Sequence, residues 1–404
     1  MAIPAWRQII LAASAVHLGL AGCASPGRLP AVPTASISQA TTGIGHVRYL
    51  VARETDSFAA EAHSAMQKEK AWLASRGHSG DLPPSYFLAI SGGGDNGAFG
   101  AGLLNGWTAA GTRPEFRLVT GVSTGALIAP FAFLGPKYDY VLERVYTQTS
   151  QKDIFRKRNF IKGFFGDGMA DTSPLAGVIA SYVNQQLLDE IAAEYAKGRV
   201  LLVGTANLDS LEPVIWNMTA IAASKSAGSV ALFRKILLAS ASIPGAFPPV
   251  MIDVNVNGTP YQEMHVDGGT MAQVFLFPPS ISAKEIAADY GRTRVAYIIR
   301  NARLDADWAS VERRTLPIAA RAIGSLTTTQ GIGDLYRIFV TSQKDGIDFN
   351  LAYIPRTFNV PHREEFDTNY MRQLYATGRQ MAQAGYQWQK YPPGYEAAAQ
   401  GKPR

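Results

Sequence analysis

The residues of this chain best suited to chemistry lie in the segment Gly121-Val122-Ser123-Thr124-Gly125. The run 117–120 before it is typical of a strand, and the apolar run 125–132 after it is typical of a buried helix. The pattern matches the G-x-S-x-G nucleophile elbow, in which a strand turns abruptly into a helix and the flanking glycines avoid collisions of the crowded backbone. We therefore expect Ser123 to present its hydroxyl as a nucleophile at a helix N-terminus.

A second segment of chemical interest is the glycine run Gly92, Gly93 and Gly94, which follows an apolar run at 86–90 and precedes a helical pattern. Glycines between a strand and a helix expose backbone N–H groups, and the helix dipole favours negative charge at the same place. Such donors stabilise the oxyanion that forms during acyl transfer. The spacing therefore predicts an oxyanion hole made of Gly92, Gly93 and Gly94.

A third segment supplies a carboxylate. Asp267 ends a predicted strand and is followed by Gly268 and Gly269, which let the loop approach a neighbouring site closely. We expect Asp267 to meet Ser123 in space.

These segments, in this order, resemble the patatin-like phospholipase family. The glycine-rich oxyanion loop, the G-x-S-x-G elbow and the D-G-G loop of that family match residues 92–94, 121–125 and 267–269, and a further block of small residues before a proline matches 239–244. The resemblance covers roughly residues 86–301. It implies a three-layer α/β/α sandwich with a mostly parallel central sheet, and a serine acyl hydrolase of lipid esters that needs no cofactor or metal. It also implies a catalytic dyad, in which Ser123 attacks the ester carbonyl and Asp267 is the base.

One residue departs from the family pattern. Asn96 stands in the glycine-rich loop where the family usually has arginine or lysine. The missing positive charge puts a preference for an anionic phosphate headgroup in doubt.

A dinucleotide-binding site is a weaker hypothesis, because Gly92, Gly94 and Gly97 also match G-x-G-x-x-G after a strand. That fold requires an acid at the end of the second strand, about 20 residues on. Glu115 has the right distance but precedes the second strand. A P-loop is excluded because no Gly-Lys-Ser/Thr follows the glycines.

A triad mechanism is a hypothesis that uses the same serine and aspartate. The order Ser123, Asp267, His362 is also that of an α/β-hydrolase triad, with His362 in a Pro-containing loop. His265 shares a strand face with Asp267 and is expected to pack beneath the site without a catalytic role. A lipoprotein that only binds lipid would be expected to lack one dyad residue, and both are present.

The first residues have the pattern of a targeting segment. Residues 1–22 read as a signal peptide, because Arg7 precedes a 13-residue apolar stretch at 9–21. As a helix this stretch rises about 20 Å, which is short of the roughly 30 Å hydrocarbon core. The segment before Cys23, the one cysteine of the chain, resembles the bacterial lipobox. That resemblance implies lipidation of Cys23, and Ala24 after it implies the outer membrane, facing the periplasm of the bacterial cell envelope.

The remaining organisation follows from composition and periodicity. Residues 23–45 are predicted to be a lipidated, flexible tether rich in small residues and proline, and residues 46–404 a catalytic domain with a C-terminal helical extension. Helices are expected at 49–75, 184–197 and 364–389, and further strands at 200–204 and 294–299. The net charge of +6 is spread along the chain, which argues against a nucleic-acid partner, and protein partners are not indicated.

Overall fold

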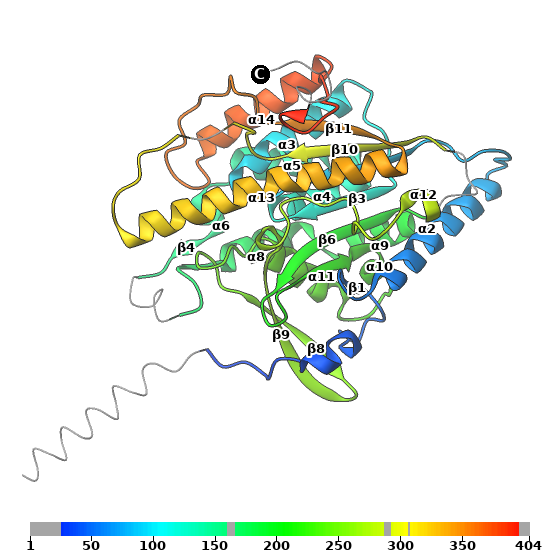
Figure 1. Ribbon diagram of the computed structural model, residues 1–404, viewed down its shortest axis with the longest axis horizontal. Helices are drawn as coiled ribbons and strands as arrows, with labels where there is room; N and C mark the ends of the chain where they lie inside the picture. Colours follow the sequence, from blue (N-terminus) through cyan, green and yellow to red (C-terminus); the bar gives the residue numbers. More distant parts are fainter. Residues whose placement is uncertain (1–25, 160–165, 287–291, 306–307, 396–404) are drawn as a thin grey trace, which may run out of the picture.

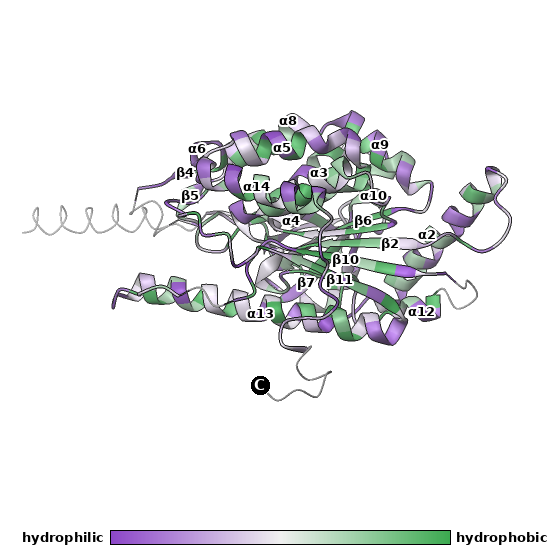
Figure 2. Ribbon diagram, turned by 90° about the horizontal axis from the view of Figure 1, so that it is seen from above, coloured by the Kyte–Doolittle hydropathy of each residue, from purple (hydrophilic) through white to green (hydrophobic). Residues whose placement is uncertain are grey.

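The computed structural model describes residues 26–159, 166–286, 292–305 and 308–395 (Figure 1). The predicted signal peptide at 1–22 and Cys23 lie outside the described residues. Within the described residues, nine strands form one central sheet that runs between two layers of helices (Figure 2).

The strands of the central sheet follow the path β1-β7-β6-β3-β2-β10-β11, with the β8–β9 hairpin attached to β6. The bounds are β1 (Arg48–Leu50), β2 (Ser85–Ile90), β3 (Leu118–Val122), β6 (Val200–Asn207), β7 (Glu212–Asn217), β8 (Val250–Val256), β9 (Thr259–Asp267), β10 (Arg294–Arg300) and β11 (Ile347–Tyr353). A separate ribbon pairs β4 (Arg156–Lys157) with β5 (Ala170–Asp171). Strands β6, β3, β2, β10 and β11 pair in parallel. The prediction of a mostly parallel sheet is confirmed.

Most of the helices cover one face of the sheet (Figure 2). They are α3 (Gly97–Ala109), α4 (Thr124–Leu134), α5 (Asp139–Gln148), α6 (Gln151–Ile154), α8 (Ser173–Tyr182), α9 (Gln185–Tyr195), α10 (Met218–Ala223), α11 (Ser229–Ser240) and α14 (Thr368–Gln383). The other face is covered by α2 (Thr55–Ser75), α12 (Ala283–Ile286) and the second half of α13 (Thr315–Asp345).

Strand β6 shows why both faces need cover. Its side chains alternate between the two faces, so Leu201 and Val203 enter the larger core while Val200 and Leu202 pack against residues of α2. A strand buried on both faces belongs to a three-layer sandwich, as the sequence resemblance implied.

Residues 26–45 differ from the flexible tether that their composition predicted. Val32 and Ile37 are buried, and residues 34–39 form a short 3-10 helix. Thr41 bridges to Asn255 of β8, and Arg28 forms an ion pair with Asp209 at 2.7 Å. The tether prediction is therefore wrong for residues 26–45, because scattered apolar side chains and long-range hydrogen bonds attach this segment to the folded body.

Two predicted helices are shorter in the structure. The helix expected at 49–75 begins only at Thr55, because Arg48–Leu50 pairs with β7 as strand β1. The helix expected at 364–389 is α14, which begins after Asp367, whose side chain caps it by accepting from the N–H groups of Asn369 and Tyr370.

Candidate active site

The elbow places Ser123 between β3 and α4, as the pattern predicted. Ser123 has φ +55° and ψ −127°, a conformation that is rare for a residue with a side chain and costs free energy. A Cβ at Gly121 would lie 2.4 Å from the carbonyl oxygen of Gly125, and one at Gly125 would lie 2.2 Å from that of Ile90. Both positions therefore require glycine for steric reasons.

Ser240, at the end of α11, holds this strained turn in place. The Ser123 N–H donates to Ser240 Oγ at 3.0 Å, and the same hydroxyl donates to the carbonyl of Gly204 at 2.7 Å. Ser240 is fully buried, so both hydrogen bonds are shielded from water. The sequence signalled it only as part of the small-residue block 239–244, and its contact with the nucleophile depends on the fold.

The meeting of Ser123 and Asp267 is a consequence of how two strands share one edge of β6. Strand β3 pairs in parallel with the first part of β6 and ends with Val122 opposite Gly204. Strand β9 pairs antiparallel with the last part of β6 and ends with Asp267 opposite Thr205. The two strands therefore run toward each other along β6, and the residues at their ends come together.

Asp267 is buried, and its carboxylate has two identified hydrogen-bond donors. It accepts from the Gly269 N–H at 2.7 Å and from the side chain of Ser123. Burial raises the pKa of Asp267 to about 6, against the opposing effect of these two hydrogen bonds. The group is therefore ionised at neutral pH and is positioned to accept the Ser123 proton.

The three glycines of the predicted oxyanion hole do not have equal roles. Gly92 lies against Ser123, but its N–H donates to the carbonyl of Gln273 at 3.0 Å. Gly93 and Gly94 adopt φ +153° and +58°, and within the described residues their N–H groups donate to no acceptor. Gly93 and Gly94 therefore keep the amides that an oxyanion could use, while that of Gly92 is already occupied.

Gln273 is a residue that sequence reasoning missed. Its side-chain N–H donates to the Gly269 carbonyl at 2.7 Å, while its own carbonyl accepts from Gly92. This one side chain and its backbone connect the loop after Asp267 to the glycine-rich loop. No local pattern marks it, because both partners are brought to it by tertiary structure.

His362 contacts a different carboxylate from the one that a triad requires. His362 Nε2 lies 2.6 Å from Asp95 Oδ2, and the Phe366 N–H donates to the same oxygen at 2.8 Å. Asp95 is buried and directly follows Gly94, whereas the donors to Asp267 are Ser123 and Gly269. The triad hypothesis is therefore wrong. The segment 354–367, here called the strap, instead ties the C-terminal part of the chain to the glycine-rich loop.

Asn96 takes part in the same attachment. The hydroxyl of Tyr370 in α14 donates to Asn96 Oδ1 at 2.6 Å, and the rings of Tyr370 and His362 lie 4.6 Å apart. Asn96, at the position where the family usually has a cation, is thus a neutral side chain that is hydrogen-bonded to α14.

His265 lies beneath the site in a buried network. Its Nδ1 is 2.9 Å from Thr205 Oγ1, which also accepts from Trp216 Nε1 at 2.8 Å. Its Nε2 is 3.2 Å from Glu263, which forms a buried ion pair with Arg48. Burial lowers the pKa of His265, so the ring is neutral and fixes the end of β9. This arrangement agrees with the expected packing role.

Glu115, the acid considered for a dinucleotide site, lies at the wrong end of the sheet. It precedes β3 and lies near Arg117 and Arg199, at 4.0 and 3.9 Å. The glycine-rich loop follows β2, which is parallel to β3, so the two are at opposite edges of the sheet. The dinucleotide hypothesis lacks its ribose-binding acid.

An apolar cavity opens beside Ser123. Ser123, directly before α4, and Leu127 and Phe131 within α4 are spaced by four residues and line one side of the cavity over about 12 Å. The rest of the wall is mostly apolar and comes from several helices, the loop after α11 and the strap, including Val145, Ile154, Leu175, Ile179, Tyr182, Leu237, Phe247, Phe366 and Met371. This shape and lining suit a hydrocarbon chain attached to a carbonyl at Ser123.

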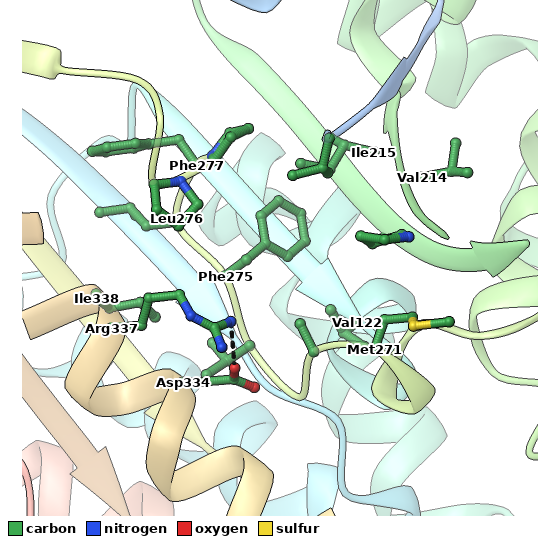
Figure 3. Close-up of a pocket in the computed structure, with 18 of the residues that line it drawn as sticks. Val122, Val214, Ile215, Met271, Phe275, Leu276, Phe277, Asp334, Arg337 and Ile338 are labelled. Carbon is green, nitrogen blue, oxygen red and sulfur yellow. Dashed lines mark hydrogen bonds and ion pairs between the residues drawn. The ribbon is translucent and has the colours of Figure 1, made fainter. Parts of the chain in front are cut away.

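A second cavity lies behind the dyad, toward α13 (Figure 3). Its wall contains Phe275 and Ile338, with the ion pair of Asp334 and Arg337 at 3.0 Å. Val122 also lines it, and because side chains alternate along β3, this cavity belongs to the other face of the sheet. The cavity that includes Ser123 itself is therefore the one we assign to substrate.

Comparison with known proteins supports the family. The family model for Patatin-like phospholipase matches residues 88–278 of the chain. No curated protein matches the chain in sequence.

Solved structures show only a weak likeness. VipD from Legionella pneumophila has a TM-score of 0.35 at 10% identity over 78% of this chain and 70% of its own. Human GIVD cytosolic phospholipase A2 has a TM-score of 0.26 at 11% identity, covering 67% of this chain and 50% of its own. Its complex with methyl gamma-linolenyl fluorophosphonate has a TM-score of 0.29 at 10% identity, covering 82% and 63%. The chain thus spans between half and two thirds of the human enzyme's structures.

Proposed function

We propose that this chain, whose residues 88–278 match the family model for Patatin-like phospholipase, is a serine acyl hydrolase that cleaves carboxylic esters of lipids through an acyl-enzyme. The observation that carries the proposal is the contact of Ser123 with a buried carboxylate, Asp267, at the wall of an apolar cavity. The contact provides a nucleophile with its base, and the cavity provides a place for an acyl chain.

The chemistry follows from these positions. Asp267 accepts the Ser123 proton as Oγ attacks the ester carbonyl, and the N–H groups of Gly93 and Gly94 stabilise the oxyanion. Asp267 then returns the proton to the leaving alcohol, which departs and leaves the acyl group on Ser123. Water then attacks this ester as Asp267 takes its proton, and Asp267 returns that proton to Ser123 Oγ as the fatty acid is released. A base with a pKa of about 6 is mostly ionised at pH 7 and is stronger than an exposed carboxylate.

Replacing Ser123 by alanine tests the proposal directly. We expect Ser123→Ala to lose hydrolysis of a p-nitrophenyl acyl ester by about 10³-fold or more, because no other group can form the acyl-enzyme. An active-site fluorophosphonate should label the wild type and leave this variant unlabelled. Ser181→Ala, on the exposed side of α8, is the matched control. Retained hydrolysis by folded Ser123→Ala protein would show that the nucleophile lies elsewhere.

The cavity makes a separate prediction about the acyl chain. Ile179 is buried in α8 and lines the cavity, so Ile179→Trp should shorten the space available to the chain. We expect activity on long-chain esters to fall at least tenfold relative to short-chain esters, in a series of p-nitrophenyl esters. Ser181→Trp adds the same bulk to the exposed side of α8 and should leave the ratio unchanged. An unchanged ratio for Ile179→Trp would remove this cavity from the proposal.

We also propose that the enzyme is a lipid-anchored protein of the bacterial envelope, acylated on Cys23 and located at the outer membrane facing the periplasm. The support is the sequence pattern around Cys23. Among the described residues, no helix has the length and apolar character needed to cross a bilayer.

A further inference from the structure

The first half of α13 is exposed to solvent. Every residue from 318 to 326 is exposed, and Ile318, Ile323 and Leu326 have exposed fractions of 50, 61 and 71%. We call residues 315–330 the α13 arm. In Figure 2 the arm extends past the rest of its layer. Exposed apolar residues gathered on one element mark an interaction site more often than isolated ones do.

The length of α13 explains why the arm projects. Its 31 residues rise about 46 Å, whereas each of the seven-residue strands β10 and β11 that it connects extends about 23 Å. The second half, with Leu335, Ile338 and Phe339, packs on the sheet. The first half therefore has no sheet beneath it (Figure 1).

The arm lies at the same edge of the sheet as the dyad. Because β10 and β11 are parallel, α13 must run back between them and begins near the carboxyl end of β10. The carboxyl end of β3, next but one in the sheet, carries Ser123. An object that touches the arm is therefore on the side of the molecule where the ester is cleaved.

The arm is amphipathic. Ile318, Ala319, Ala322, Ile323 and Leu326 fall on one stripe of the helix, because they are spaced by one, three and four residues. Arg321 lies outside this stripe. Trp308, in the loop before α13, is 86% exposed. An apolar stripe with exposed arginines before and beside it, and a nearby tryptophan, is typical of segments that lie in a membrane interface.

The charges favour an anionic lipid surface over a second copy of the chain. Arg313, Arg314 and Arg321 are exposed, and no acidic residue occurs from 313 to 333. The nearest acid, Glu312, pairs with Arg314 at 3.4 Å. Two arms packed together would bring like charges into contact, whereas anionic headgroups would neutralise them.

We propose that the α13 arm inserts its apolar stripe into the surface of an anionic bilayer and holds the active-site edge of the enzyme against it. The proposal rests on the proposed function only in its choice of a lipid surface as the place where substrate is found. Binding itself needs no catalysis, so it can be measured in a chain without the nucleophile.

The test is flotation with vesicles of phosphatidylcholine, with or without phosphatidylglycerol. The protein is the mature chain with Ser123→Ala and Cys23→Ser, so that neither turnover nor an acyl chain contributes. We expect Ile323→Ser with Leu326→Ser to weaken binding to the phosphatidylglycerol vesicles at least tenfold. Val340→Ser is the matched control, because Val340 is 62% exposed on the same helix but lies over the folded body. It should leave binding unchanged.

A second pair of substitutions tests the charges. Arg313→Gln with Arg314→Gln should reduce binding several-fold and remove most of its dependence on salt and on phosphatidylglycerol. Equal binding by the Ile323→Ser, Leu326→Ser chain and the unsubstituted chain would overturn the proposal. So would a dimer, seen by light scattering, that this double substitution dissociates without changing flotation. Turnover of a soluble ester by the chain with Ser123 and Cys23→Ser tests the proposed function separately.

Discussion

Asp267, which we propose as the base, is also a cost to the stability of the fold. Burial raises its pKa from an ordinary value of 3.8 to about 6, so the folded state holds its proton more tightly than the unfolded state does. The stability linked to this proton is fully present below pH 4 and is lost as the pH rises through 6. The difference corresponds to roughly 3 kcal/mol at most, which is a large share of the stability of an ordinary domain.

Asp267→Asn should therefore separate activity from stability. We expect ester hydrolysis to fall about 10²–10⁴-fold, because an amide cannot accept the Ser123 proton. At pH 8 the free energy of unfolding should rise by about 1–3 kcal/mol, since a buried charge is removed, and the gain should vanish near pH 4. Denaturant unfolding at both pH values measures this, with Asp189→Asn on the exposed side of α9 as control. In the wild type, kcat/KM should rise with pH with a midpoint near 6. If Asp267→Asn were less stable than the wild type at pH 8, the burial of the Asp267 charge would not be a cost to the fold.

The strap connects the C-terminal part of the chain to the glycine-rich loop through its hydrogen bonds to Asp95. His362→Ala removes one of the two donors to Asp95 Oδ2 and leaves the Phe366 N–H in place. We expect kcat/KM on a soluble ester to fall only a few-fold, with the midpoint near pH 6 unchanged because it belongs to Asp267. His63→Ala, exposed on α2, is the control. A loss as large as that of Asp267→Asn, with the midpoint abolished, would restore histidine as the base.

The whole molecule has one edge on which several features coincide. Asp209 follows the carboxyl end of β6 and pairs with Arg28, so the described chain begins toward the edge of the sheet that carries Ser123. Cys23 precedes Arg28 by five positions, which limits their separation to about 17 Å. An acylated Cys23 would therefore bring this edge toward the bilayer. Three acyl chains would anchor the protein more firmly than the arm alone.

Cys23→Ser tests this anchor in cells. We expect most of the protein to leave the membrane fraction after a high-salt wash, because the arm alone binds reversibly and through charge. Activity of the mature chain on a soluble ester should be retained, since Cys23 lies outside the folded residues that form the site. Mass spectrometry of the wild-type N-terminus decides the matter, and an unmodified cysteine or a different first residue would contradict lipidation.

Local patterns in the sequence determined the elements that carry the chemistry. The elbow at 121–125 could be recognised from its spacing, because the steric conflict at Gly121 involves the backbone of Gly125 and Ala126. The conflict at Gly125 involves the distant backbone of Ile90 and Ser91. The strand β2, the helix α9 and the parallel arrangement followed in the same way from apolar runs and periodicity. The order of the motifs then indicated the family and its dyad.

Tertiary structure alone decided which of these groups contact each other. Ser240 lies 117 positions from Ser123, and His362 lies 267 positions from Asp95, so no spacing along the chain predicts either contact. The packing of residues 26–45 against β8, and the projection of the α13 arm, depend likewise on what surface is available in the folded molecule. The composition of a segment predicts how it interacts with water and with residues close to it in the sequence. It does not report which distant strand edge or loop will satisfy its polar groups, and that information appears only when the chain is folded.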